Sequence, residues 1–195
     1  GMLSEQALAA NRWFVELATK HKVVPPSAPT DAFRQIVDGF KAGRSAMIIH
    51  HIGSSTEIVG ALGDKVSAVP VPRAANGGGW TYFGDESNAV FAGSKNKEAA
   101  FRWISFLSSG DNNVEQAKLS GQLPVTISGG KNWTLHPQRF VDASSASLPI
   151  ARSLPDHVKT PDFTARILPT NIQRALAGEI APDDVMKAIE QLYHG

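Results

Sequence analysis

The chain contains no cysteine among its 195 residues. This absence excludes disulfide bonds, thiolate nucleophiles and most zinc frameworks. It does not fix the cellular compartment, because exported proteins also fold without cysteine. The sequence also lacks an apolar run of about 18 residues, so no transmembrane helix is expected.

The chain also lacks an excess of charge of either sign. The chain has 19 basic and 18 acidic residues, for a net charge of +1, and its Lys and Arg residues form no run. This balance excludes the basic footprint of a nucleic-acid-binding protein and an acidic disordered tail. Only 8% of the residues are aromatic, which argues against a stacking platform for single-stranded nucleic acid. We therefore expect no nucleic-acid partner.

The motifs of common enzymes and cofactor sites are missing as well. The chain has no Gly-x-Ser-x-Gly elbow, and no Gly-Lys-Ser/Thr element follows the run at Gly77-Gly78-Gly79. His50 and His51 are adjacent, and neighbouring strand residues point to opposite faces, so the two cannot chelate one ion together. We expect no cofactor, no metal and no enzymatic activity.

Helical periodicity is what the sequence has in abundance. Ser4 is placed to cap a first helix that ends near Lys22, and Thr30 or Asp31 to cap a second that Gly43 closes. Ser54 and Glu57 have the spacing of a capping box. Further helices are predicted over residues 96–107 and 112–119, from 136 onward, over 163–176 with a break at Pro169, and over 182–193.

Short apolar or alternating runs predict strands in the first half. These are residues 45–50, 66–71, 80–83 and 88–91. Strands that alternate with helices early, followed by a second half rich in helices, indicate an α/β fold.

Five sequence features, in this order, resemble one family. Phe40-x-x-Gly43-x-x-Ala46-Met47 is a helix end that runs into a strand, and Val69-Pro70-Val71-Pro72 ends a strand before glycines. Gly84-Asp85 precedes a strand and the helix start Ser94 to Ala100, and Gly121-Gln122-Leu123-Pro124 is an exit turn. Two closing helices follow, Thr170 to Gly178 and Pro182 to Tyr193. In these features the chain resembles the extracellular solute-binding proteins of bacterial ABC importers, the sugar-binding group that includes maltose-binding protein.

The resemblance implies a type II periplasmic-binding-protein-like fold. It assigns residues 3–83 to part of the C-terminal lobe, 84–124 to the hinge crossing and a segment of the other lobe, and 125–195 to returning helices of the C-terminal lobe. Family members are longer, so the chain resembles a fragment that lacks most of one lobe, and an export signal would lie upstream. Gly1-Met2 resembles a cleavage remnant. The full-length protein is expected in the periplasm or outside the cell.

The resemblance also implies a set of ligand-binding residues. Family pockets hold sugars by aromatic stacking and by polar side chains near helix starts. The predicted residues are His51, Gly53, Ser54, Ser55, Trp80, Tyr82, Asp85, Glu86 and Arg166.

Each of these residues also has a purely structural interpretation. Ser54 would cap a helix, Trp80 and Tyr82 would pack in a strand, the two acids would be solvated turn residues, and Arg166 would lie at the surface.

The functional hypothesis is a sugar-binding or polar-solute-binding component that closes its lobes on a ligand and delivers it to an ABC permease. Two alternatives stay open. One is a carbohydrate-active enzyme, which needs paired carboxylates across a cleft. The other is a truncated, non-functional product whose exposed apolar helix (residues 96–107) drives formation of a simple or swapped homodimer.

Overall fold

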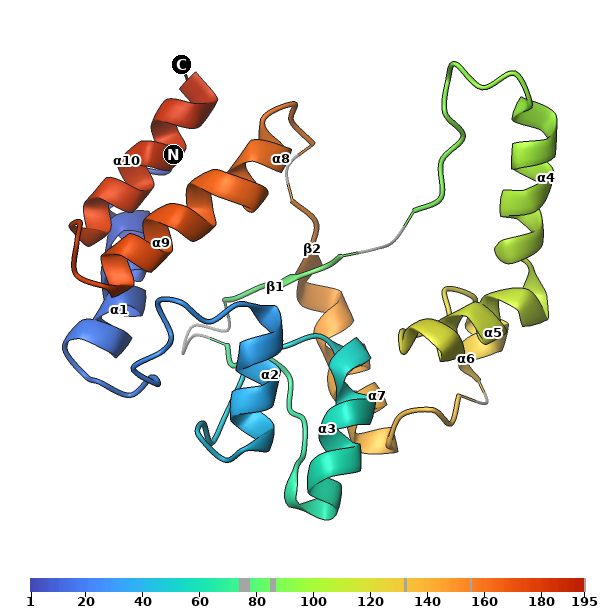
Figure 1. Cartoon of the computed structure of the whole chain (residues 1–195), viewed down its shortest axis with the longest axis horizontal. Coiled ribbons are helices and arrows are strands. Elements are labelled where there is room, and N and C mark those ends of the chain that lie inside the picture. The colour runs from blue at the N-terminus through green and yellow to red at the C-terminus, as the bar shows by residue number, and fades with distance from the viewer. Residues whose placement is uncertain (74–77, 85–86, 132, 155, 195) are drawn as a thin grey trace. The chain divides into compact units, whose positions relative to one another are not determined.

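The computed structural model describes residues 1–73, 78–84, 87–131, 133–154 and 156–194 (Figure 1). The chain divides into two compact units. Unit 1 comprises Gly1–Ile48 and Leu154–Gly195, and unit 2 comprises Ile49–Ser153. The predicted lobe boundaries at 83/84 and 124/125 differ from these limits, and the lobe assignment stays a prediction.

Unit 1 is a helical assembly around one small apolar core. Its helices are α1 (Glu5–Thr19), α2 (Phe33–Lys41), α8 (Thr160–Asp162), α9 (Leu168–Leu176) and α10 (Pro182–His194). Helices α1, α9 and α10 lie side by side (Figure 1) and bury Val15, Ala175, Val185 and Ile189 together. This burial is the main stabilising contribution in the unit.

Local signals in unit 1 act largely as predicted. The Ser4 side chain accepts a hydrogen bond from the amide of Ala7, as an N-cap should, and Pro182 begins α10. The prediction that Thr30 or Asp31 caps α2 is wrong, because Ala32 occupies the N-cap without a side-chain bond. Gly43 follows α2 with a φ of 73°, the left-handed conformation predicted there.

A π-helical turn, Phe163–Ile167, stands just before the predicted break at Pro169. The amide of Leu168 donates to the carbonyl of Phe163, five residues back. Proline has no amide hydrogen and its ring collides with the carbonyl four residues earlier, so the wider turn lets the helix continue into α9.

Unit 2 holds the remaining elements. They are η1 (Ile52–Ser54), α3 (Ser55–Leu62), η2 (Gly63–Lys65), β1 (Thr81–Tyr82), α4 (Lys97–Leu107), α5 (Gly110–Ser120), α6 (Ile127–Gly130), α7 (Gln138–Ser147), η3 (Leu148–Ile150) and β2 (Ala151–Arg152). Arg139 on α7 donates to the carbonyls of Val66 and Gly63, which ties the segment after α3 to α7.

The strand predictions fail more often than the helix predictions. Residues 45–50, 66–71 and 88–91 form no strand, and of 80–83 only β1 is a strand, paired in parallel with β2. A strand needs a neighbour for its backbone groups, and parallel strands are normally covered on both faces. Met47 and Ile49 are instead 86% and 83% exposed. The helix-rich second half is confirmed.

Candidate functional site

The turn His51–Ser55 in unit 2 contains four of the predicted ligand residues. The amide of Gly53 donates to His51 Nδ1 at 3.0 Å, so the imidazole, not a serine, caps η1. Ser54 makes no capping bond to α3, and the predicted capping box is therefore wrong. Ser54 and Ser55 are buried, at 4% and 2% exposure, while the His51 side chain is exposed. Of the four, His51 is the one whose side chain faces solvent.

The end of α5 supports this turn from one side. Gly121 ends α5 with a φ of 72°, and the amide of Gln122 donates back to the carbonyl of Ala117. A Cβ atom on Gly121 would lie 3.1 Å from the carbonyl oxygen of Gly53, and one on Gly53 would lie 2.7 Å from Gln122 Nε2. Glycine at 121 lets the end of α5 approach the Gly53 backbone this closely, and glycine at 53 leaves room for the Gln122 side chain.

A buried histidine holds the end of α5 in place. Trp133 Nε1 donates to His136 Nδ1 at 2.7 Å, and His136 Nε2 lies 3.0 Å from the Gly121 carbonyl oxygen. An indole nitrogen can only donate, so Nδ1 is the acceptor and Nε2 carries the proton that bonds to Gly121. Burial lowers the pKa of His136, and the bond to Gly121 raises it by a smaller amount. His136 is therefore neutral and bonded at both nitrogens.

This network was not predicted from the sequence. The spacing Trp133-x-x-His136 brings the two rings together, with centroids 5.7 Å apart. The hydrogen bond from His136 to the Gly121 carbonyl joins residues 15 positions apart through a turn, and no local sequence pattern predicts it.

Trp80 and Tyr82 lie on and beside β1, also in unit 2. Both side chains are exposed, at 64% and 61%, so the interpretation that they pack in a strand interior is wrong. Thr81 pairs with Ala151 and Tyr82 with Arg152. No local sequence pattern points to Arg152, because its neighbour on the paired strand, Tyr82, lies 70 positions earlier in the chain.

The remaining predicted residues lie elsewhere. Asp85 and Glu86 are outside the described residues, so their role stays a prediction. Arg166 belongs to unit 1, where it forms an exposed ion pair with Asp162, four residues earlier, at 3.4 Å. That ion pair accounts for Arg166 as a surface residue.

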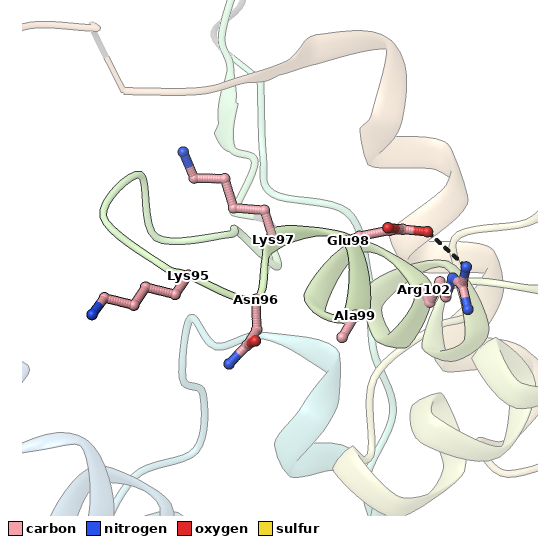
Figure 2. A pocket seen from close by; sticks show the side chains of 6 residues that line it. All are labelled: Lys95, Asn96, Lys97, Glu98, Ala99 and Arg102. Carbon is pink, nitrogen blue, oxygen red and sulfur yellow. Dashed lines mark hydrogen bonds and ion pairs between the residues drawn. The ribbon is translucent and has the colours of Figure 1, made fainter.

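A shallow hollow of about 320 Å³ lies at the start of α4 (Figure 2). Its lining is polar, and the ion pair between Glu98 and Arg102, 2.6 Å long, spans one side of it. The lining residues are Lys95, Asn96, Lys97, Glu98, Ala99 and Arg102. Of the predicted ligand residues that the structure describes, none borders this hollow.

The two adjacent histidines, His50 and His51, are not arranged as the sequence predicted. His50 and His51 do not lie on a strand, and their ring centroids are only 4.8 Å apart, so the argument from opposite strand faces is wrong. Burial, followed by the nearby charge of His51, lowers the pKa of His50.

Within the described ranges, no three His, Asp or Glu side chains come together as a metal-binding group. Nor do those ranges contain a helix long and apolar enough to cross a membrane.

Several solved structures share the fold of this chain. The maltose-maltodextrin binding protein of Alicyclobacillus acidocaldarius is 18% identical, with a TM-score of 0.77 over 100% of this chain and 52% of that one. The T. maritima protein MalE3 with maltose bound is 21% identical, with a TM-score of 0.73 over 99% and 51%. A solute-binding protein of an ABC transporter from Thermotoga lettingae, bound with α-D-tagatose, is 23% identical, with a TM-score of 0.73 over 98% and 49%.

These likenesses establish the fold as that of type II periplasmic binding proteins, and the chain spans about half the length of the structures it matches. A family model described as bacterial extracellular solute-binding protein matches residues 3–132. The chain belongs to this family of bacterial extracellular solute-binding proteins. Among curated proteins, no match is found.

Proposed function

We propose that this chain is part of the solute-binding component of a bacterial ABC importer, and that it captures a sugar or a related polar small molecule in the periplasm or outside the cell. The observation that carries the proposal is the family match over residues 3–132. The sugar-bound solved structures that share the fold favour a sugar as the ligand class.

The side chains of unit 2 are suited to such a ligand. Trp80 and Tyr82 present exposed aromatic faces, which take the C–H faces of a sugar ring. The exposed imidazole of His51 adds a polar group. No step of this function changes the ligand covalently, so none of these residues needs a catalytic role. Asp85 and Glu86 stay predicted acceptors for hydroxyl groups, and Arg166, in unit 1, stays a separate predicted ligand residue.

Capture in this proposal needs a second surface that closes over the ligand, followed by delivery to a membrane permease. Because the chain spans about half the length of the structures it matches, we expect the isolated chain to bind weakly. Binding in the millimolar range is the expected result.

The test is a titration of the ¹⁵N-labelled chain with maltose, followed by NMR. The indole signal of Trp80 and the amide of Gly53 should shift progressively. Trp80→Ala should abolish the response, whereas Trp13→Ala should leave it unchanged, although Trp13 on α1 is equally exposed at 61%. Equal loss in both variants, or tight micromolar binding by this chain, would contradict the proposed site and the two-surface capture.

The enzymatic alternative has a separate test. The family and the solved structures are binding proteins. Incubation with chromogenic glycosides should release no chromophore above the rate without protein. A protein-dependent release that persists in Trp13→Ala would favour a carbohydrate-active enzyme instead.

We also propose that the isolated chain self-associates weakly through α4. Phe101, Trp103 and Phe106 on this helix are 61%, 59% and 53% exposed, and the helix has no buried residue. These three rings expose roughly 300–400 Å². Each partner of a stable complex buries about 800 Å², so a weak association between two copies is expected.

Sedimentation velocity over a range of protein concentrations tests this association. The mean sedimentation coefficient should rise with concentration in the wild type and in Trp13→Asp. It should stay constant in Trp103→Asp. A rise that Trp13→Asp abolishes and Trp103→Asp preserves would assign self-association to another surface.

A further inference from the structure

The two-stranded ribbon of β1 and β2 has an inner and an outer face. Thr81 and its partner Ala151 are half-buried, whereas Tyr82 and its partner Arg152 are exposed. Side chains alternate between faces along a strand, and paired residues share a face. The outer face therefore carries Tyr82 and Arg152 next to each other, and Trp80, two residues before Tyr82, belongs to the same face by this alternation.

The ring of Tyr82 lies close to the backbone of Gly84. A Cβ atom on Gly84 would lie 2.8 Å from Tyr82 Cε1 and 3.2 Å from its hydroxyl oxygen. The absence of a side chain at Gly84 therefore leaves room for the ring in this position. The Tyr82 side chain is still 61% exposed, so much of its surface is accessible to a ligand.

Arg152 has unused hydrogen-bonding capacity. Its guanidinium has five N–H donors, and Nη1 donates to the carbonyl oxygen of Ala151 at 2.7 Å. Across the described residues, no carboxylate lies within ion-pair distance of Arg152, although most other arginines of the chain have one. A guanidinium without a carboxylate matches the planar, bidentate geometry of an incoming carboxylate.

A second guanidinium-bearing residue lies beside the same segment. The Cα atom of Arg73 is 3.7 Å from the Cβ position of Gly79, the residue before Trp80. Arg73 likewise has no ion-pair partner in the part of the chain that the structure describes. Two cationic residues thus border the aromatic pair.

We propose that this outer face, formed by Trp80, Tyr82 and Arg152, selects sugars that carry a carboxylate, such as uronic acids. The inference rests on the proposed function and narrows its ligand class. The aromatic faces take the C–H face of the sugar ring, and the Arg152 guanidinium takes the carboxylate in two parallel hydrogen bonds. Arg73 contributes long-range attraction that salt weakens.

The test compares two probes that differ at one carboxyl group, D-glucuronate, which is charged, and its uncharged methyl ester. Each is titrated into the ¹⁵N-labelled chain at constant ionic strength, and the signals of the Trp80 indole and the Tyr82 amide are followed. Glucuronate should bind about fivefold more tightly than its ester, the gain typical of one exposed charge-assisted contact. Arg152→Gln should remove this preference and leave the affinity for the ester unchanged.

Arg174→Gln is the matched control, because the Arg174 guanidinium is exposed and already paired with Glu179. It should keep the full preference for glucuronate. If both probes bind equally to the wild type, the proposed selectivity is wrong while sugar binding stands. If neither probe shifts the Trp80 signal but maltose does, the selectivity is likewise wrong. If no sugar shifts it, the proposed function of this face fails together with the inference. If the Arg152→Gln protein still prefers glucuronate to its ester, the glucuronate carboxylate binds to a cation other than Arg152, and the proposed role of Arg152 is wrong.

Discussion

Replacing His136 with phenylalanine should destabilise unit 2. His136 is 3% exposed, and its two nitrogens join Trp133 Nε1 to the carbonyl oxygen of Gly121. Phenylalanine is also a planar ring but leaves both groups without a partner. A buried polar group that loses its partner costs about 1–3 kcal/mol. We therefore expect a loss of roughly 3 kcal/mol in the free energy of unfolding and a fall in Tm of about 10 °C.

Trp133 supplies a site-specific signal for this experiment. It is buried, whereas the other three tryptophans, at positions 13, 80 and 103, are more than half exposed. The change in emission on unfolding in urea therefore reports chiefly on the surroundings of Trp133. In the His136→Phe protein the folded-state emission itself should change, because the indole loses its acceptor.

Two further variants make the result decisive. His136→Gln can restore one hydrogen bond, so its stability should lie between those of the wild type and His136→Phe. His21→Phe, at an exposed histidine, should change stability by less than about 0.5 kcal/mol. A His136→Phe protein that unfolds at the wild-type urea concentration would refute the reasoning, since the network would then contribute nothing.

Two other predictions concern the same buried network. Burial lowers the pKa values of His136 and His50, so on acidification the unfolded chain takes up protons before the folded chain does. The stability present above pH about 6.5 should therefore be lost as the pH falls towards the folded-state pKa values. Urea midpoints measured from neutral to mildly acidic pH check this, and a midpoint that rises on acidification would contradict it. Gly121→Ala should lower the free energy of unfolding more than Gly43→Ala does, although both glycines have a φ near 70°. The methyl group at 121 would press on the Gly53 carbonyl, whereas nothing lies within 4 Å of a methyl group at 43. The conformational penalty common to both is about 1–2 kcal/mol, and calorimetric Tm values of the two variants measure the difference.

The sequence predicted helices well because their signals are local. Ser4, Gly43 and Pro182 each act within one turn of the element that they begin or end. The helix restart near Pro169 was also predictable, since the missing amide hydrogen affects the carbonyl one turn earlier. Two cap predictions failed: Ala32 stands at the N-cap of α2 in place of Thr30 or Asp31, and Ser54, despite its capping-box spacing, follows a 3₁₀ turn that His51 caps.

Strands and the supports of the site were less predictable because their partners are distant. Tyr82 pairs with Arg152 across 70 positions, and apolar runs such as residues 45–50 find no strand neighbour among the described residues. Trp80 and Tyr82 were predicted as ligand residues and are exposed, but nothing near them in the sequence pointed to Arg152. His136 was missed for the same reason, since its contact with Gly121 depends on the turn between them.

Two groups of exposed aromatic residues in unit 2 have different surroundings. On the β1–β2 ribbon, Tyr82 lies against a glycine, and its neighbour Arg152 has no ion-pair partner among the described residues, an arrangement that leaves a ring and a cation accessible to a small polar molecule. On α4, Trp103 stacks with Phe106 at 5.7 Å, and the guanidinium of Arg102 is already paired with Glu98. A helix face whose exposed rings stack on each other and whose arginine is paired suits another apolar protein surface better than a sugar. Ligand titration and sedimentation should therefore respond to different substitutions, the first to Trp80→Ala and the second to Trp103→Asp.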